Sequence, residues 1–221
     1  MKSLIISLLL LSIAPSLLAQ SIHFGVRGGL NESYIAGLSP ANGTKGHLRS
    51  GFHAGAFAEF KFKKWSVEPG LFYTVKGYKA TSNVVQTTPG GTFNISISGT
   101  QTYQYIELPV NLLYNLKIKP GKIFIGGGPY TGYLISAIGK RNTTTNGTNV
   151  YTETKFDIGG DGNFKRNDFG LGGRVGMAFK NGIQFSAGAS FGFTNIVIHN
   201  INNNPSVTKN RVLSFSVGYL F

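Results

Sequence analysis

Apolar and polar side chains alternate with a period of two in eight separate segments of this sequence. In the first segment Ile22, Phe24 and Val26 alternate with polar or small residues, and the same pattern returns along the rest of the chain. Successive side chains of a β-strand point to opposite faces, so each segment predicts a strand with one apolar and one polar face. The predicted strands span residues 22–30, 52–62, 65–75, 106–114, 122–137, 169–179, 183–193 and 213–221.

The connections between these segments alternate between long and short. The short ones are Lys63-Lys64, residues 117–121 and Lys180-Asn181-Gly182, in which Asn-Gly is a strong hairpin signal. An even number of strands joined by alternating short turns and long loops is typical of outer-membrane barrels. We therefore expect an all-β fold, an eight-stranded antiparallel transmembrane up-and-down β-barrel, with no helix in the mature chain.

The position of the acidic residues indicates which solvent the apolar face meets. Glu59, Glu68 and Glu107 all fall on the polar face of their strands. A lipid-facing surface demands this placement, because a charge at mid-bilayer is costly. A soluble, lipocalin-like barrel would turn its apolar face inward, and the period alone does not separate the two. The alternation of the loops and the aromatic residues at strand ends favour the membrane.

Composition restricts the classes of function. Charged residues make up 13% of the 221 residues, against about 25% in a soluble domain, and there is no Cys. Disulfide frameworks, Cys-based zinc sites and thiol nucleophiles are therefore excluded. Lys and Arg outnumber Asp and Glu by 21 to 8, which favours a polyanionic partner without saying which one. Because the basic residues are scattered and not gathered on one face, we expect no nucleic-acid partner.

Residues 1–19 have the layout of a secretory signal peptide. A basic start at Lys2 precedes an apolar run from Leu4 to Ala14 and a cleavage region that ends at Ala19. An uncleaved anchor is the alternative, but the apolar run is short for crossing a bilayer. We expect residues 20–221 to form the barrel domain, in the outer membrane of a Gram-negative cell and with both termini in the periplasm.

The end of the chain and three internal motifs carry a family resemblance. The segment from Val217 to Phe221 resembles the C-terminal signal recognised by the barrel-assembly machinery, with Tyr219 and Phe221 as its aromatic positions. The resemblance implies insertion by that machinery, an eight-stranded barrel of the PorT-like outer-membrane family and, for most members, no assigned activity. One family member takes part in a secretion system, but no motif here singles out that role. The internal motifs are Tyr105-Ile106-Glu107-Leu108-Pro109-Val110, Gly128-Pro129-Tyr130 and Asp168-Phe169-Gly170-Leu171.

Seven charged residues lie on the polar face and so point into the predicted lumen. The interior of an eight-stranded barrel is just wide enough for side chains to fill it. An unpaired buried charge is expensive, so we expect opposite charges to pair and to plug the lumen. The predicted network consists of Arg27, Glu59, Lys61, Glu68, Lys76, Glu107 and Arg174.

The histidines do not predict an enzyme. A catalytic His needs a nucleophile and an orienting acid within hydrogen-bond reach. No His-x-Ser spacing and no nucleophile elbow accompanies His23, His47, His53 or His199. We therefore expect scattered polar residues and no catalytic site.

One segment partly imitates a calcium-binding loop. It runs from Asp157 to Asp168, but Gly159 stands where a ligand is needed, and Lys165 and Arg166 oppose a cation. An ordinary turn rich in Gly and Asp is the favoured alternative. We expect no metal and no cofactor.

Two functions from different classes remain. The first, which we favour, is a monomeric structural or surface-interaction barrel whose long loops contact lipopolysaccharide, envelope proteins or a secretion complex. The second is a porin-like barrel that passes small solutes. A basic rim that faces lipopolysaccharide is predicted at Lys140, Arg141, Lys165 and Arg166, since the loops hold few acidic residues.

Overall fold

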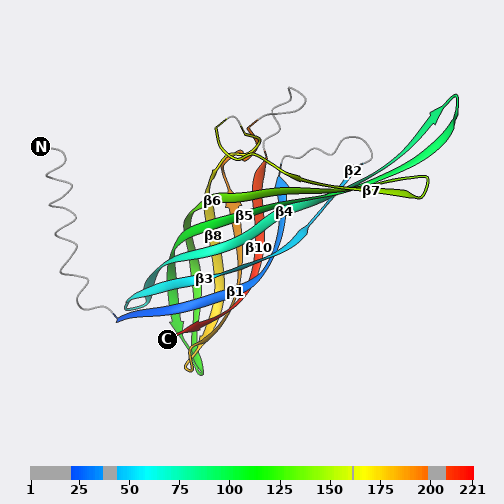
Figure 1. The fold of residues 1–221 in the computed structure, drawn as a ribbon. Coiled ribbons are helices and arrows are strands. Elements are labelled where there is room, and N and C mark those ends of the chain that lie inside the picture. The colour runs from blue at the N-terminus through cyan, green and yellow to red at the C-terminus, as the bar shows by residue number, and fades with distance from the viewer. Residues whose placement is uncertain (1–20, 37–43, 161, 199–207) are drawn as a thin grey trace, which may run out of the picture.

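The computed structural model describes residues 21–36, 44–160, 162–198 and 208–221, and the predicted signal peptide lies outside these ranges. Among the described residues no helix is long and apolar enough to cross a membrane. The described ranges form ten strands, most of which Figure 1 labels. They are β1 (Ser21–Ala36), β2 (Thr44–His47), β3 (Arg49–Phe62), β4 (Trp65–Thr88), β5 (Gly91–Lys117), β6 (Gly121–Thr145), β7 (Thr148–Lys155), β8 (Asn167–Phe179), β9 (Ile183–Gly192) and β10 (Lys209–Leu220).

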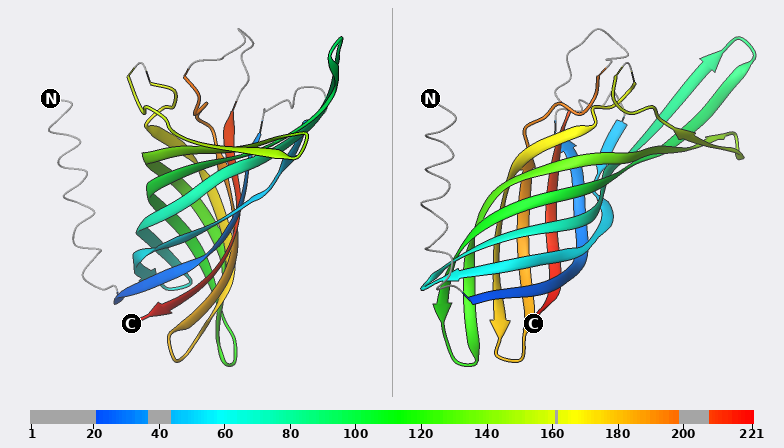
Figure 2. Two further views of the ribbon diagram at one scale, coloured as in Figure 1. Left: turned by 45° about the vertical axis from the view of Figure 1, so that its right-hand side comes forward. Right: turned by 60° about the vertical axis from the view of Figure 1, so that its left-hand side comes forward.

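All strand pairs are antiparallel, and most strands pair with their neighbours in the chain. The sheet runs in the order β4-β3-β1-β10-β9-β8-β6-β5, and β5 also pairs with β4, so the sheet returns to its starting strand. We call these strands the ring. The expectation of an antiparallel, up-and-down, all-β fold is confirmed. The other two strands lie outside the ring, because β2 pairs with β4 and β7 pairs with β6 (Figure 2).

Two of the predicted long loops are largely β-structure, which corrects the sequence prediction. The sheet continues beyond the ring through residues 44–47, 79–88, 91–100, 140–145 and 148–155, and this projecting part is called the arm (Figure 1). The hairpin between β6 and β7 turns at Asn146 and Gly147, whose φ angles of 48° and 89° suit a type I′ turn. No residue of the arm is buried. Apolar and polar side chains alternate in the short stretch that contains Phe93, Ile95 and Ile97, and the other segments of the arm lack the alternation that marks the ring.

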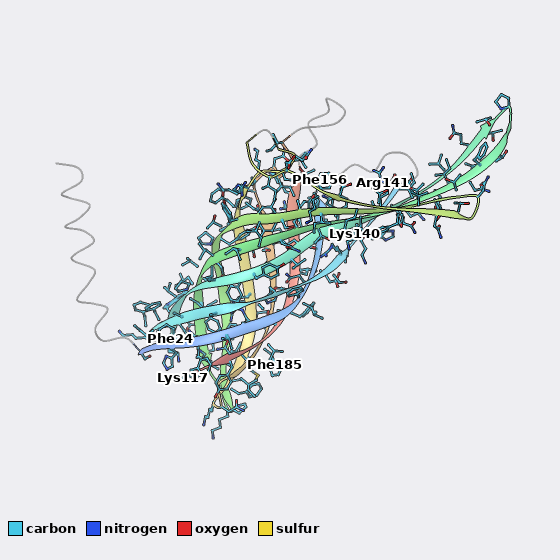
Figure 3. The ribbon with its side chains drawn as sticks, in the orientation of Figure 1. Phe24, Lys117, Lys140, Arg141, Phe156 and Phe185 are labelled. Atoms are coloured by element: carbon cyan, nitrogen blue, oxygen red, sulfur yellow. The ribbon has the colours of Figure 1, made fainter. Side chains whose placement is uncertain are left out.

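The two faces of the ring differ sharply in polarity. Phe24, Leu71 and Phe215 are 66%, 55% and 61% exposed on the outer face, whereas Glu59 and Glu68 are 2% exposed on the inner face. Figure 3 shows Phe24 and Phe185 on the outside of the ring. The apolar side chains thus face outward and the charges inward, as the alternation predicted.

An apolar cluster covers the end of the ring next to the arm. Phe164 and Ile196, from the segments that precede β8 and follow β9, pack against Tyr103, Tyr105 and Leu134 of the ring. Backbone hydrogen bonds hold the two segments together, including Lys165 N–H to the Ile196 carbonyl at 2.8 Å. This end is called the covered end, and the opposite end, with the short connections β3–β4, β5–β6 and β8–β9, is called the turn end.

Candidate functional site

The interior of the ring contains three ion-pair clusters. The first is centred on Glu68 of β4, whose Oε1 lies 2.9 Å from Arg27 Nη1 and 2.5 Å from Arg174 Nη1. These arginines come from β1 and β8, which are not neighbours of β4 in the ring. One buried carboxylate therefore joins three separate parts of the wall.

The arginines of this cluster also lie over aromatic rings. The guanidinium of Arg27 is 4.7 Å from the ring centroid of Phe72 and 5.0 Å from that of Phe57. That of Arg174 is 4.6 Å from the centroid of Phe124. A desolvated cation over an aromatic face is attracted by the ring quadrupole. This attraction helps to stabilise two arginines that share the single negative charge of Glu68.

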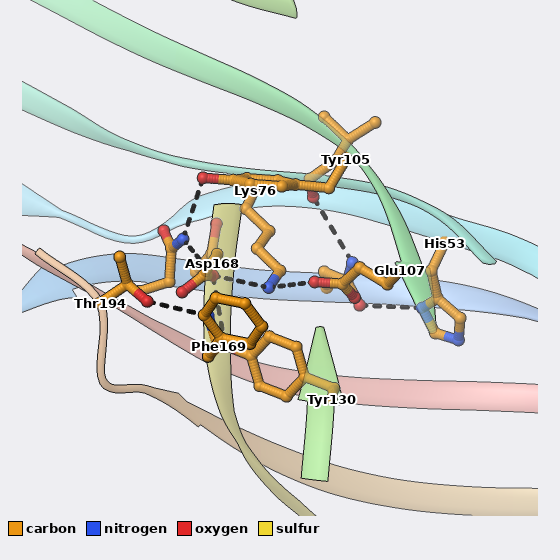
Figure 4. A network of polar contacts seen from close by, with 12 residues as sticks. His53, Lys76, Tyr105, Glu107, Tyr130, Asp168, Phe169 and Thr194 are labelled. Carbon is orange, nitrogen blue, oxygen red and sulfur yellow. Dashed lines mark hydrogen bonds and ion pairs between the residues drawn. The ribbon is translucent and has the colours of Figure 1, made fainter. Parts of the chain in front are cut away.

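The second cluster is centred on Lys76, which is 1% exposed (Figure 4). Its ammonium pairs with Glu107 and lies 3.7 Å from Asp168 Oδ2. The rings of Tyr105 and Tyr130 lie around it, with centroids 5.2 and 4.7 Å away. A Cβ at Gly170 would lie 2.5 Å from Tyr130, so the glycine leaves the space that this ring occupies.

The third cluster lies closest to the turn end. Glu59 pairs with Lys122 of β6 and lies 3.4 Å from the ammonium of Lys61. All seven charged residues named from the sequence take part in ion pairs. Sequence reasoning missed Lys122 and Asp168, because nothing in the sequence shows which residues meet across the ring.

The ring of His53 lies within hydrogen-bond distance of two side chains, and the sequence did not indicate either contact. Its Nδ1 lies 2.8 Å from Asn31 Oδ1 and its Nε2 lies 2.9 Å from Ser216 Oγ. The Ser216 hydroxyl partner of His53 could not be seen from sequence spacing, because β3 and β10 both pair with β1 and only the fold brings the three residues together. The adjoining cavity is small, about 130 Å³, and Asn31 is a neutral orienting group. His199 lies outside the described residues.

The predicted basic rim is divided between two places. Lys140 and Arg141 line a cavity of about 530 Å³ beside the arm, together with Phe156 (Figure 3), and Lys140 pairs with Glu153 at 3.3 Å. Arg166 instead lies over the ring of Tyr133 and donates to the Ile158 carbonyl at 2.8 Å. Tyr133 and Lys140 are seven residues apart on β6, roughly 23 Å along a strand.

The calcium-like segment is organised around an aromatic side chain. Phe164 packs in the apolar cluster, and Asp168 points inward to Lys76 and to the Asn210 amide at 2.8 Å. Asp161 lies outside the described residues. Among the described residues there is no group of three or more His, Asp or Glu that could hold a metal ion.

The aromatic residues of the predicted assembly signal lie together on the outer face. The rings of Tyr219 and Phe221 are 5.1 Å apart, and their side chains are 43% and 70% exposed. The Phe221 N–H donates to the Phe24 carbonyl at 2.8 Å, which connects the end of the chain to β1. Recognition by the assembly machinery stays a prediction.

A closed antiparallel sheet with an apolar exterior and a charged interior defines the class of β-proteins that inhabit membranes. The chain belongs to the family described as the outer membrane protein beta-barrel domain, whose model matches residues 18–197. Among curated proteins, none matches the chain.

Solved outer-membrane proteins resemble the structure at low identity. Neisserial surface protein A is 12% identical with a TM-score of 0.37, over 91% of this chain and 99% of that chain. Ail of Yersinia pestis, in complex with the heparin analogue sucrose octasulfate, is 13% identical with a TM-score of 0.40 and the same coverage. OprG from Pseudomonas aeruginosa is 19% identical with a TM-score of 0.34, over 91% of this chain and 97% of that chain.

Proposed function

We propose that the ring is an eight-stranded barrel that spans the outer membrane, with a plugged lumen and a structural or surface-interaction role. The turn end and both termini face the periplasm, residues 1–19 are removed on export, and the arm stands outside the cell. The barrel is a monomer and not an enzyme. Assignment to the PorT-like branch of the family rests on the motifs around Glu107, Pro129 and Asp168.

The observation that carries this proposal is the inverted polarity of the ring. Side chains such as Phe24, Leu71 and Phe215 would expose a large apolar surface to water, and soluble monomers rarely do so. Lipid removes that cost, while closure of the sheet satisfies the backbone hydrogen bonds that hydrocarbon does not.

The ion pairs support a plugged lumen. Glu68 of β4 joins Arg27 of β1 and Arg174 of β8, and Lys76 with Asp168 again joins β4 to β8 nearer the covered end. A hydrated solute would have to separate these pairs, and an unpaired charge in this interior is expensive. The apolar cluster of Phe164 and Ile196 closes the covered end.

The arm supports a role in surface interaction. It presents the free edge of β7, in which every residue is exposed, including Val150 and Tyr151 at 59% and 61%. An unpaired strand edge is a template for contact with another chain. Lipopolysaccharide and envelope or secretion proteins are the partners we propose for the outer surface.

Single-channel recording in planar bilayers tests the proposal. We expect the purified chain to insert without producing conductance steps, whereas a general diffusion porin does produce them in the same bilayer. Regular steps would contradict the plugged lumen and support the alternative, a barrel that passes small solutes. Insertion itself is checked separately, because a closed barrel migrates faster unboiled than boiled on a denaturing gel.

A further inference from the structure

The turn end of the ring carries a concentration of lysines that the ion-pair clusters leave free. All three short connections contribute, with Lys63 and Lys64, Lys117 and Lys119, and Lys180. All five are exposed, and none forms an ion pair with another described residue. Figure 3 shows Lys117 at this end.

These lysines surround a cavity of about 1500 Å³ that opens at the turn end. Four of them line it, namely Lys63, Lys64, Lys117 and Lys180, and Lys61 and Lys122 lie deeper along its wall. No acidic residue is among its described lining residues. Phe221 is also among the lining residues, and it carries the α-carboxylate of the sequence's last residue. Glu59 pairs with Lys61 and Lys122.

Three residues of the cavity lining carry buried side-chain atoms that have no hydrogen-bond partner among the described residues. Gln184 is 4% exposed and Asn115 is 9% exposed, and the side-chain oxygen of each is buried with no partner among the described residues. His23 Nδ1, in the same lining, is also buried and unpartnered. Buried polar groups normally find hydrogen bonds, so these groups point to a ligand that brings donors as well as negative charge.

We propose that this cavity is a docking site for an acidic, extended peptide segment of another protein. Carboxylates of the segment pair with the rim lysines, and its backbone N–H groups donate to the amide oxygens of Gln184 and Asn115. The cavity exceeds the usual size of small-molecule sites, about 300–1,000 Å³, and suits a length of chain. Placement of that partner in the periplasm rests on the proposed function, whereas binding itself does not.

An anionic lipid leaflet is less suited to the cavity than a peptide. Two aromatic pairs lie on the outer wall at this end, Trp65 with Tyr114 at 5.0 Å and Tyr219 with Phe221 at 5.1 Å, and Tyr219 and Phe221 also contribute to the lining of the cavity. Such belts lie at the headgroup level of a bilayer. The six lining lysines surround the mouth of the ring, where a soluble segment has access.

Fluorescence anisotropy with the full chain in neutral detergent tests the site. The probe is a fluorescein-labelled peptide of alternating glutamate and serine, and the same peptide with glutamine in place of glutamate is the neutral probe. We expect K63Q/K64Q/K117Q/K180Q to weaken binding by about tenfold or more at physiological ionic strength. The matched control K45Q/K79Q/K155Q/K209Q removes the same charge elsewhere and should bind as the wild type does.

A second variant distinguishes the contribution of hydrogen bonds inside the cavity from that of the rim lysines. Gln184→Leu keeps every charge, and we expect it to weaken the peptide several-fold because the amide oxygen no longer accepts a hydrogen bond. Equal losses in the two lysine variants, or no loss in Gln184→Leu, would overturn the docking site. Displacement of the peptide by phosphatidylglycerol vesicles but not by phosphatidylcholine vesicles would assign the lysines to the leaflet and would also overturn it. The heat-dependent gel shift of each variant reports on the barrel independently.

Discussion

The Nζ atom of Lys76 lies 3.7 Å from Oδ2 of Asp168, although the strands that carry them are separated in the ring by β5 and β6. The contact therefore crosses the interior between strands that are not neighbours. Glu68 does the same with Arg174 at 2.5 Å. Contacts of this kind support the proposed plugged lumen.

Removal of Lys76 should destabilise the barrel strongly. In Lys76→Met, Glu107 and Asp168 lose their cation in a buried place, and breaking a buried pair in this way typically costs about 3–5 kcal/mol. We expect this loss in the free energy of unfolding, measured by urea titration in lipid vesicles with tryptophan fluorescence. Lys140→Met breaks the exposed pair with Glu153 and should stay close to the wild type. Equal stability of the two variants would contradict the structural role of the interior charges.

One pair of substitutions distinguishes the membrane-facing wall from the arm. Val175 of β8 and Val150 of β7 are both exposed valines on strands, 47% and 59% respectively. Arg at a lipid-facing position near the midplane costs about 2–4 kcal/mol, whereas Arg in water costs little. We therefore expect Val175→Arg to lower the free energy of unfolding in vesicles and Val150→Arg to leave it unchanged. A loss of stability in both variants would mean that the arm lies in lipid. No loss in either variant would mean that the ring does not lie in lipid.

The strands of the ring were predictable because each lies between two different environments. Lipid on one side and a charged interior on the other impose alternation, as at Phe24 and Glu59. The arm has no buried residue, and alternation marks it only in the short stretch with Phe93, Ile95 and Ile97, so its residues were interpreted as loops. A second local signal was Asn146-Gly147, the same dipeptide that marks the turn at Asn181-Gly182.

The contacts across the ring could not be predicted. Arg27, Glu68 and Lys76 lie on the polar faces of their strands, which predicted that they point inward. Which ion-pair partner each one meets depends on the register of strands that are far apart in the sequence. Asp168 was therefore interpreted as the end of the calcium-like segment and not as a partner of Lys76, and Ser216 was not connected with His53. The turn-end lysines were visible as turn residues, but the cavity that they surround exists only in the folded chain.

The hairpin of β6 and β7 should depend on Gly147. Its φ of 89° is in the left-handed region, where a side chain costs roughly 1–2 kcal/mol. We expect Gly147→Ala to speed amide hydrogen exchange in β7 and the paired part of β6, with no change in the ring. Gly46→Ala in β2 is the control, because a Cβ there meets nothing within 4 Å. Faster exchange throughout the ring would show that the arm and the ring unfold together.

The basic residues at the outer surface should act as two independent pairs. Lys140 and Arg141 lie beside the arm, and Lys165 and Arg166 lie near Tyr133, roughly 23 Å away along β6. That separation exceeds the screening length of about 8 Å at physiological salt, and effects at distant sites usually add. We expect K140Q/R141Q and K165Q/R166Q each to weaken binding to purified lipopolysaccharide, and the combined variant to show the sum of the two losses in free energy. Surface plasmon resonance at low and physiological ionic strength measures this, and the losses should shrink as salt rises.

Within each pair we expect Arg141 and Lys165 to contribute more to binding, because Lys140 already pairs with Glu153 and Arg166 already donates to the Ile158 carbonyl. Unchanged binding by the combined variant at low salt would show that these cations do not recognise lipopolysaccharide.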